Sequence, residues 1–235
     1  MLINAIAAAG QSLPQSESRG AYVPPVKRHF GIRHCPAITL LVPAMHSIMA
    51  EQGLQLVLEA GQSLPVHVCW RLDDGYLRAA SWTDQAEIFT LGIWGPGEIV
   101  VPQLLTQQPM ELRALSAVRV QEWNAGTAEH EDFTTTHIQQ LGTLLRLTRI
   151  RPAEARLFHL LIWLSRRFGV STEQGRSVPL ESMNLTHRLL AEMASVSRVT
   201  VTKTLGHFRQ QGWLARVGEL EVLAEPGFTH FQSLR

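Results

Sequence analysis

Six side chains near the C-terminus have the types and spacing that suit recognition of base pairs in DNA. Arg198 and Lys203 carry hydrogen-bond donors, and Val199 carries two methyl groups. An arginine can form paired hydrogen bonds with N7 and O6 of guanine, a valine can contact the thymine methyl, and a lysine can bond a base edge or a phosphate. Three accompanying hydroxyls can cap a helix or donate to phosphates: Ser197, Thr200 and Thr202. The expected partner is double-stranded DNA.

Two short helices are expected to position these side chains. A first helix over about 185–194 and a tight connection at 195–197 precede a second helix that runs to about Gln211. The apolar residues of the second helix are spaced four and three apart and predict its buried face: Val201, Leu205 and Phe208. The six candidate residues then lie in the half that enters the major groove in a helix-turn-helix. Strands over 213–217 and 220–223 predict a wing.

The stretch 185–223 resembles the DNA-binding domain of the cyclic-AMP receptor/Fnr family of transcription regulators. Residues 198–206 are particularly similar to the cyanobacterial global nitrogen regulator. The resemblance implies that Arg198, Val199 and Lys203 contact bases and that a homodimer binds a palindromic site. The family often has glutamate where Val199 stands, and a valine cannot accept a hydrogen bond from cytosine. The resemblance therefore implies half-sites with GTA and TAC arms in place of the TGTGA type.

Short apolar runs separated by turn residues indicate a β-domain over residues 38–128. The runs lie at 55–58, 66–70, 76–80, 88–91, 99–101 and 117–120. Their spacing is typical of an antiparallel sandwich or barrel. The family resemblance implies a jelly-roll similar to cyclic-nucleotide-binding domains. Residues 1–37 are rich in serine, glycine and proline, so they are predicted to form a flexible N-terminal extension.

One long helix with an apolar stripe is expected over residues 129–149. Such a stripe either covers the β-domain or pairs with a second copy, and the resemblance implies a dimerisation helix. The predicted dimerisation residues are Phe133, Ile138, Leu141, Leu144, Leu145 and Thr148. Residues 150–235 are predicted to form the winged-helix domain, beginning with a buried helix after Pro152. The expected fold class is α+β, with an N-terminal β jelly-roll, a long helix and a C-terminal winged helix-turn-helix.

The β-domain departs from the family's cyclic-nucleotide binders where they hold the phosphate. The segment 95–99 resembles the turn that precedes their phosphate-binding residues. The resemblance then implies Gly-Glu-Leu and Arg-Ser-Ala elements, but residues 100–105 and Gln107-Gln108-Pro109 stand in that region. A buried cyclic phosphate would meet no matching arginine or hydroxyl. Cyclic AMP is therefore not expected as the effector.

Other effectors stay open, and the effector-binding residues are unknown. The similarity to the nitrogen regulator suggests 2-oxoglutarate, whose carboxylate could pair with Arg113 or Arg119. Both arginines also suit solvated positions on a strand. Cys35 and Cys69 form no CxxC pair, so no metal site or cofactor is expected. Four scattered histidines indicate surface or core positions more than haem ligation: His46, His67, His130 and His137.

Composition narrows the class of protein further. With 45% hydrophobic and 17% charged residues the chain is typical of a globular protein, and its net charge of +1 requires the basic DNA-binding surface to be local. No apolar run approaches the roughly 18 residues of a spanning helix, which predicts a cytoplasmic protein. His67 has no neighbouring histidine or glutamate to complete a metal cluster, so no enzyme is expected.

Two hypotheses about the β-domain follow. It either senses an unidentified small molecule, or it is a degenerate sensor in a ligand-independent regulator or protein-interaction module that docks RNA polymerase or another regulator. The missing phosphate-binding residues favour the second hypothesis. RNA polymerase is an expected partner of the regulator, whereas the target genes and the direction of regulation are not encoded in any motif.

Overall fold

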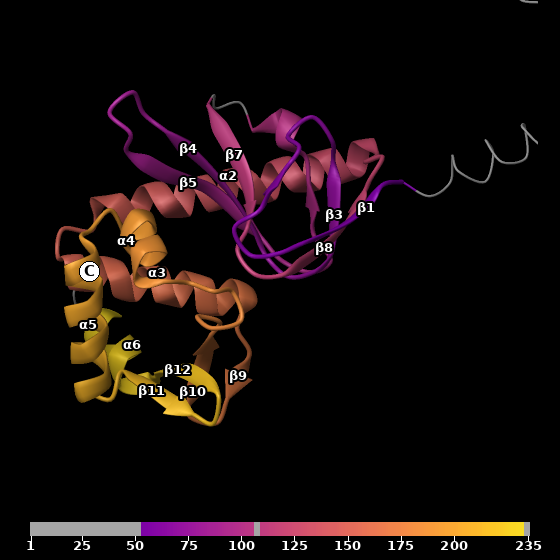
Figure 1. The fold of residues 1–235 in the computed structure, drawn as a ribbon. Coiled ribbons are helices and arrows are strands. Elements are labelled where there is room, and N and C mark those ends of the chain that lie inside the picture. The colour runs from indigo at the N-terminus through magenta and orange to yellow at the C-terminus, as the bar shows by residue number, and fades with distance from the viewer. Residues whose placement is uncertain (1–52, 106–108, 233–235) are drawn as a thin grey trace, which may run out of the picture. The chain divides into compact units, whose positions relative to one another are not determined.

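A computed structural model describes residues 53–105 and 109–232 of the chain. Two four-stranded antiparallel sheets form the N-terminal β-domain (Figure 1). One sheet has the order β1 (Gln55–Leu58), β8 (Val118–Glu122), β3 (Trp70–Asp74) and β6 (Ile99–Val100). The other has the order β2 (Ser63–Leu64), β7 (Met110–Ala114), β4 (Leu77–Trp82) and β5 (Ile88–Trp94). The predicted extension 1–37 and residues 38–52 lie outside the described residues.

The alternation of apolar and polar residues sets the two faces of these strands. In β7, Leu112 and Ala114 are buried while Arg113 between them is exposed. The side chains of Trp70, Leu72, Leu77 and Val120 are fully buried in the same core. Burial of one face of each strand fixes the strand register, because a one-residue shift would expose these side chains.

The structure differs from the predicted strands in two details. Residues 66–69 form a turn, and the strand begins only at Trp70. Pro65 ends the preceding segment, and its carbonyl accepts a hydrogen bond from Trp70 Nε1 at 2.9 Å, which closes the turn. Strands β2 and β7 were not predicted, because β2 has only two residues and β7 carries charged residues among its apolar ones.

The long helix α2 (Thr127–Arg149) follows the β-domain and packs against β5 and β6. It begins two residues before the predicted start, because a Glu129 carboxylate oxygen accepts the Gly126 N–H at 2.7 Å and caps the helix. The predicted stripe divides between two faces. Phe133 and Leu144 are buried in the chain's own core, whereas Ile138 and Leu145 are each more than 60% exposed. This burial corrects the assignment of Phe133 and Leu144 to a dimer seam.

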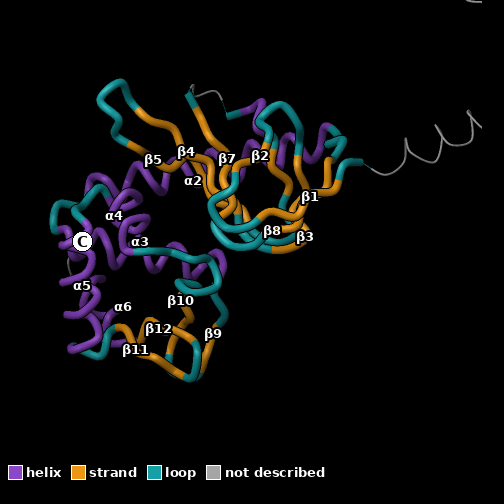
Figure 2. Tube along the Cα trace, in the orientation of Figure 1, coloured by secondary structure: helices purple, strands orange, loops and turns teal. Residues whose placement is uncertain are grey.

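The remaining elements build the C-terminal domain. Helix α3 (Ala153–Phe168) is followed by β9 (Ser171–Thr172), β10 (Gly175–Val178), α4 (His187–Ala194), α5 (Arg198–Gln210), β11 (Leu214–Val217), β12 (Leu220–Ala224) and α6 (Glu225–Gln232). The sheet order is β11-β12-β10-β9, so the predicted wing hairpin extends into a four-stranded sheet (Figure 2). Strands β9 and β10 and helix α6 were not predicted. The α+β class and the helix-turn-helix are confirmed.

The core of the C-terminal domain is built around α3. Phe158 stacks on Phe231 of α6 with a ring-centroid distance of 4.3 Å and meets Phe208 of α5 edge-on at 5.4 Å. All three phenylalanines are buried. Helix α3 therefore connects α2 to the helix that carries the candidate DNA-binding residues. None of the helices within 53–105 and 109–232 is long and apolar enough to span a membrane.

Candidate nucleic-acid interface

The turn between α4 and α5 fixes where the second helix begins. Thr186 caps α4 by accepting the Leu189 N–H, and α4 ends at Ser195, which adopts a left-handed conformation with φ of 51°. The Ser197 side chain then accepts the Thr200 N–H at 3.0 Å and caps α5. The predicted connection at 195–197 is thus a tight turn between two capped helices, which is the helix-turn-helix arrangement.

Helix α5 has one buried and one exposed face. Val201, Leu205 and Phe208 are at most 1% exposed and join the core of the C-terminal domain, as predicted. Arg198, Val199 and Lys203 are exposed, with Val199 at 62%. The exposed face of the helix therefore carries two cations and one apolar side chain. The sequence pattern thus separates the two faces of the helix correctly.

The six predicted residues have two kinds of local role. The side chains of Arg198 and Lys203 form no hydrogen bond or ion pair with any described residue. The three hydroxyls are engaged: Ser197 Oγ and Thr200 Oγ1 lie 2.8 Å apart, and Thr202 Oγ1 donates to the Arg198 carbonyl at 3.1 Å. Arg198, Lys203 and Val199 are therefore free to contact a partner molecule, while the hydroxyls stabilise the start of the helix.

Two residues that the sequence reasoning missed hold this surface in place. Arg156 of α3 donates to the carbonyls of Ala194 and Ser195 at 3.1 and 3.0 Å, so it caps the end of α4. His187 of α4 lies with Nδ1 2.9 Å from Thr202 Oγ1 and joins the two helices. Arg156 is 38 residues from Ala194 in sequence, so no local pattern reveals this contact.

The wing is attached to the same helix. The turn between β11 and β12 contains Gly218 with φ of 62°, a conformation that favours glycine. Arg209 of α5 forms an ion pair with Glu221 of β12, with an N–O distance of 2.7 Å. Arg216 of β11 has a side chain that is 66% exposed. The wing therefore adds an exposed guanidinium to the domain that carries the α5 surface.

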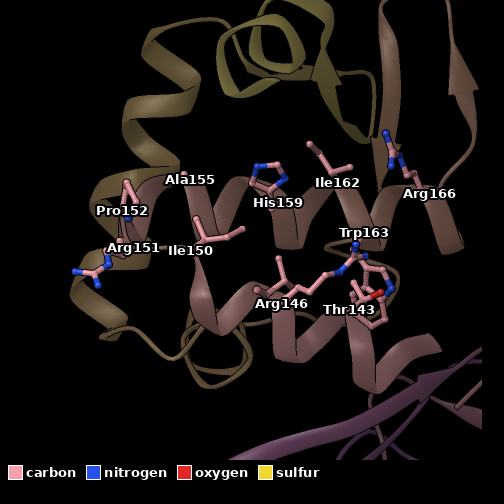
Figure 3. Close-up of a pocket in the computed structure, with 11 residues that line it drawn as sticks. Thr143, Arg146, Ile150, Arg151, Pro152, Ala155, His159, Ile162, Trp163 and Arg166 are labelled. Carbon is pink, nitrogen blue, oxygen red and sulfur yellow. The ribbon is translucent and has the colours of Figure 1, made fainter. Parts of the chain in front are cut away.

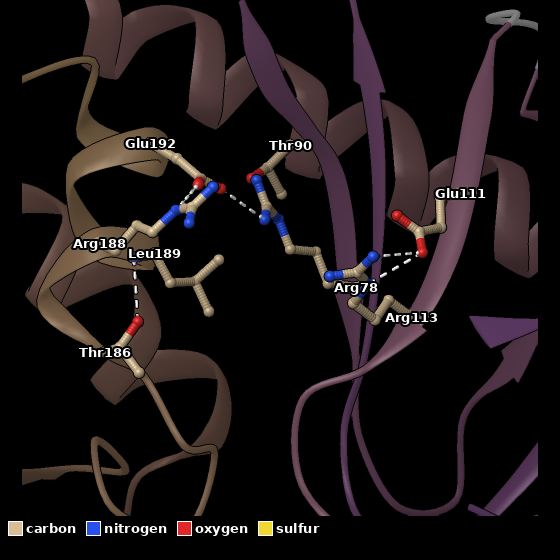
Figure 4. A network of polar contacts seen from close by, with 8 residues as sticks. All are labelled: Arg78, Thr90, Glu111, Arg113, Thr186, Arg188, Leu189 and Glu192. Carbon is tan, nitrogen blue, oxygen red and sulfur yellow. Dashed lines mark hydrogen bonds and ion pairs between the residues drawn. The ribbon is translucent and has the colours of Figure 1, made fainter. Parts of the chain in front are cut away.

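An ion pair between a buried arginine and a half-buried glutamate links the first helix of the helix-turn-helix to the β-domain (Figure 4). Arg78 of β4 donates from Nε to Thr90 at 2.9 Å and from Nη1 to Glu192 of α4 at 3.0 Å. The other Glu192 oxygen lies 3.2 Å from Arg188 Nε. Burial lowers the pKa of Arg78, and the hydrogen bond to Glu192 opposes that shift. Separating α4 from β4 would leave a buried charge without its carboxylate.

The Gly95–Glu98 turn is occupied by the chain itself. One Glu98 carboxylate oxygen accepts the Gly95 N–H at 2.7 Å, and the other lies 2.6 Å from Arg167 of α3. The short 3-10 helix Pro102–Leu104 follows, and its Gln103 side chain donates to the His67 carbonyl at 2.8 Å. Gln107 and Gln108 lie outside the described residues. Glu98, in the turn that resembles the one preceding the family's phosphate-binding residues, is thus engaged in two structural contacts.

Aromatic rings fill the space between β5 and α2. Phe133 stacks on Trp94 and on His137, with centroid distances of 5.7 and 5.8 Å. Burial lowers the pKa of His137. A cavity of about 300 Å³ adjoins this stack. The charged side chains that line it are all acidic: Glu98, Glu129 and Asp132. A phosphate in this cavity would meet carboxylates and no cation.

The other candidate effector residues lie on the surface. Arg113 is exposed and forms an ion pair with Glu111, with an N–O distance of 2.7 Å, and Arg119 is exposed on β8. Burial tends to raise the pKa of Glu111, but hydrogen bonds from Ser63 and Arg113 outweigh it and lower the pKa. Within the described residues, no three His, Cys, Asp or Glu side chains are grouped as metal ligands would be.

Most of the chain is similar to known regulatory proteins. Residues 155–230 match the family of Crp-like helix-turn-helix domains. The chain is 34% identical over 191 residues to the regulatory protein CysR of Synechococcus elongatus, covering 81% of this chain and 93% of that protein. It is 30% identical over 109 residues to the global nitrogen regulator of Synechocystis sp., covering 43% of this chain and 46% of that protein.

The fold is also similar to that of a CRP/FNR-family transcriptional regulator from Thermus thermophilus. The TM-score is 0.58 at 17% sequence identity, and the match covers 77% of this chain and 98% of that chain. These similarities confirm the family resemblance that residues 185–223 predicted, and they extend it through the β-domain.

Proposed function

Because the chain belongs to the Crp/Fnr family of transcription regulators, we propose that it binds a palindromic DNA site as a homodimer, with α5 in the major groove. The observation that carries the proposal is the exposed face of α5. Arg198 and Lys203 lie there without partners among the described residues, on a helix whose opposite face is fully buried. Their free donors match the acceptors of guanine and phosphate. Since the proposed partner is DNA, we expect the protein in the cytoplasm.

A DNA titration with matched variants tests the role of Arg198. The protein is titrated into a labelled duplex with GTA and TAC arms, and the titration is repeated with single base changes. Arg198→Ala should weaken binding by about 1–3 kcal/mol and abolish discrimination at one base pair. Arg119→Ala removes an exposed arginine of β8 and serves as the control, with unchanged affinity. An equal loss on every sequence would make Arg198 a phosphate contact and reject base reading.

The proposed dimer seam is the exposed face of α2. Ile138, Leu141, Leu145 and Thr148 are all exposed and follow one another at three- and four-residue steps. This spacing is the a/d pattern of a two-stranded coiled coil. Exposed leucines on a long helix are costly without a partner, and a second copy of the same helix buries them symmetrically.

For the β-domain we propose that it lacks the usual cyclic-nucleotide site. Residues 100–105 and Gln107-Gln108-Pro109 lack the arginine and hydroxyl of the family's phosphate-binding elements, which supports this proposal. The charged side chains that line the cavity beside Trp94 are all acidic, which also disfavours a phosphate there. The same observations favour the second candidate function, in which the domain docks another protein and does not gate DNA binding by cyclic AMP. Contact with RNA polymerase stays a prediction. Adding cyclic AMP to the DNA titration should leave the affinity unchanged, and a cyclic-AMP-dependent increase would overturn the proposal.

A further inference from the structure

A cavity of about 600 Å³ lies between the C-terminal half of α2 and helix α3 (Figure 3). Its size falls within the range of small-molecule sites. Apolar side chains from both helices line it, among them Leu147 of α2 and Ile162 and Trp163 of α3. Leu147 is buried, and the other two are half-buried. The cavity therefore offers an apolar wall to a ligand of drug-like size.

The side chains that line this cavity carry positive charge and no negative charge. Arg146, Arg151 and Arg166 all line it, and none of the lining residues is acidic. In the described part of the chain, no hydrogen bond or ion pair forms to any of these three guanidinium groups. Elsewhere Arg113 and Arg167 each pair with a carboxylate. An anionic ligand would supply the negative charge that the lining residues lack.

The cavity lies away from the proposed dimer seam. At roughly 100° per residue along α2, Arg146 and Ile150 point to a different side of the helix from Leu141 and Leu145. Pairing of two α2 helices through the exposed leucines therefore leaves the cavity open. Figure 3 shows Arg151 and Arg166 toward opposite ends of the site, with Arg146 extending between the helices toward Trp163.

We propose that this cavity binds a small organic anion with an apolar body. Its carboxylate, sulfonate or phosphate group pairs with Arg146, and its ring or chain packs on Trp163, Ile162 and Leu147. Arg151 and Arg166 add positive potential at the two ends. The ligand contacts both α2 and α3, and Phe158 of α3 packs on Phe208 of α5. An effect of this ligand on DNA binding by α5 rests on the proposed function. Binding of the ligand to the cavity does not.

Two fluorescent probes with the same rings test the site without DNA. 8-Anilinonaphthalene-1-sulfonate carries a sulfonate, and N-phenyl-1-naphthylamine lacks it. We expect Arg146→Gln to weaken binding of the sulfonate about tenfold, the effect of one charge-assisted hydrogen bond, and to change binding of the neutral probe less than twofold. Trp163→Ala should weaken both probes. Arg149→Gln removes an exposed arginine of the same helix that does not line the cavity, and it is the matched control.

Three outcomes would overturn the proposal. The first is sulfonate binding that Arg146→Gln leaves unchanged. The second is an equal loss with Arg149→Gln, which reports a general charge effect. The third is a change in sedimentation caused by Arg146→Gln, which would mean that a second copy of the chain fills the cavity. Arg146 is exposed, so its variant is expected to keep the wild-type circular dichroism and thermal midpoint. Since the assay contains no DNA, its failure leaves the DNA-binding proposal standing.

Discussion

The C-terminal domain and the β-domain differ in how far their charged and aromatic side chains are paired or packed. On α5, Arg198 and Lys203 are exposed and have no partner among the described residues. In the β-domain, Arg78 and Arg113 pair with glutamates, and Trp94 packs against the rings of Phe133 and His137 of α2. The α5 surface is therefore left open for a partner, as the proposed DNA binding requires, whereas these β-domain side chains serve packing and attachment.

The largest expected effect comes from opening the aromatic stack. Trp94 is 1% exposed, so Trp94→Ala should lower the free energy of unfolding by about 3–5 kcal/mol, because it leaves a large cavity between β5 and α2. The control is Trp82→Ala on the neighbouring strand β4, where the side chain is 38% exposed. Denaturant unfolding of both variants checks the comparison. Equal losses would mean that the stack is not a packed core.

The exposed stripe of α2 is expected to have the next largest effect. Replacing both Leu141 and Leu145 by alanine removes four leucines from a symmetric seam, which should weaken the dimer by about 2–4 kcal/mol. Sedimentation velocity across a concentration series measures the shift toward monomer. Val57→Ala, a change at a side chain that is 74% exposed on β1, is the control and should leave the profile unchanged. An unchanged profile for the double variant would reject this placement of the seam.

Two ion pairs allow the two regions to be compared directly. Arg78 and Glu192 have side chains that are 9% and 21% exposed. Arg209, which pairs with Glu221 of the wing, is 46% exposed. Glu192→Gln leaves Arg78 buried without a counter-charge and should cost about 2 kcal/mol of unfolding free energy, reduced from the fully buried case because Glu192 is partly solvated. Glu221→Gln should cost less than about 1 kcal/mol. Chemical denaturation of both variants measures the two losses of unfolding free energy. A larger loss for Glu221→Gln than for Glu192→Gln would contradict this expectation.

The smallest expected effect is a pH dependence that arises from His137. Its pKa is lowered in the folded chain, so below about pH 6.5 the unfolded chain binds a proton that the folded chain does not. The free energy of unfolding should therefore fall as the pH drops through that value toward the folded pKa, by at most about 1.4 kcal/mol per pH unit. His137→Phe should remove this contribution. A wild-type slope in the variant would assign the dependence to other groups.

The sequence predicted the helix-turn-helix well because its signals are local. Ser197 as a cap and the four-and-three spacing of Val201, Leu205 and Phe208 depend on residues within one helix. Arg156 at the end of α4 and the pair of Arg78 with Glu192 depend on contacts between distant segments, which no local pattern records. The stripe of α2 was assigned to one partner because periodicity marks apolar residues without saying which of two faces each one joins.

Selection of bound sequences from a random duplex pool tests the central proposal most directly. The full chain, without added ligand, is incubated with the pool, and the bound duplexes are sequenced after several rounds. We expect enrichment of a palindrome with GTA and TAC arms whose half-sites lie one helical turn apart, about 34 Å. Enrichment of a single unrepeated motif would contradict the dimeric arrangement, and no enrichment at all would contradict ligand-independent reading of DNA by α5.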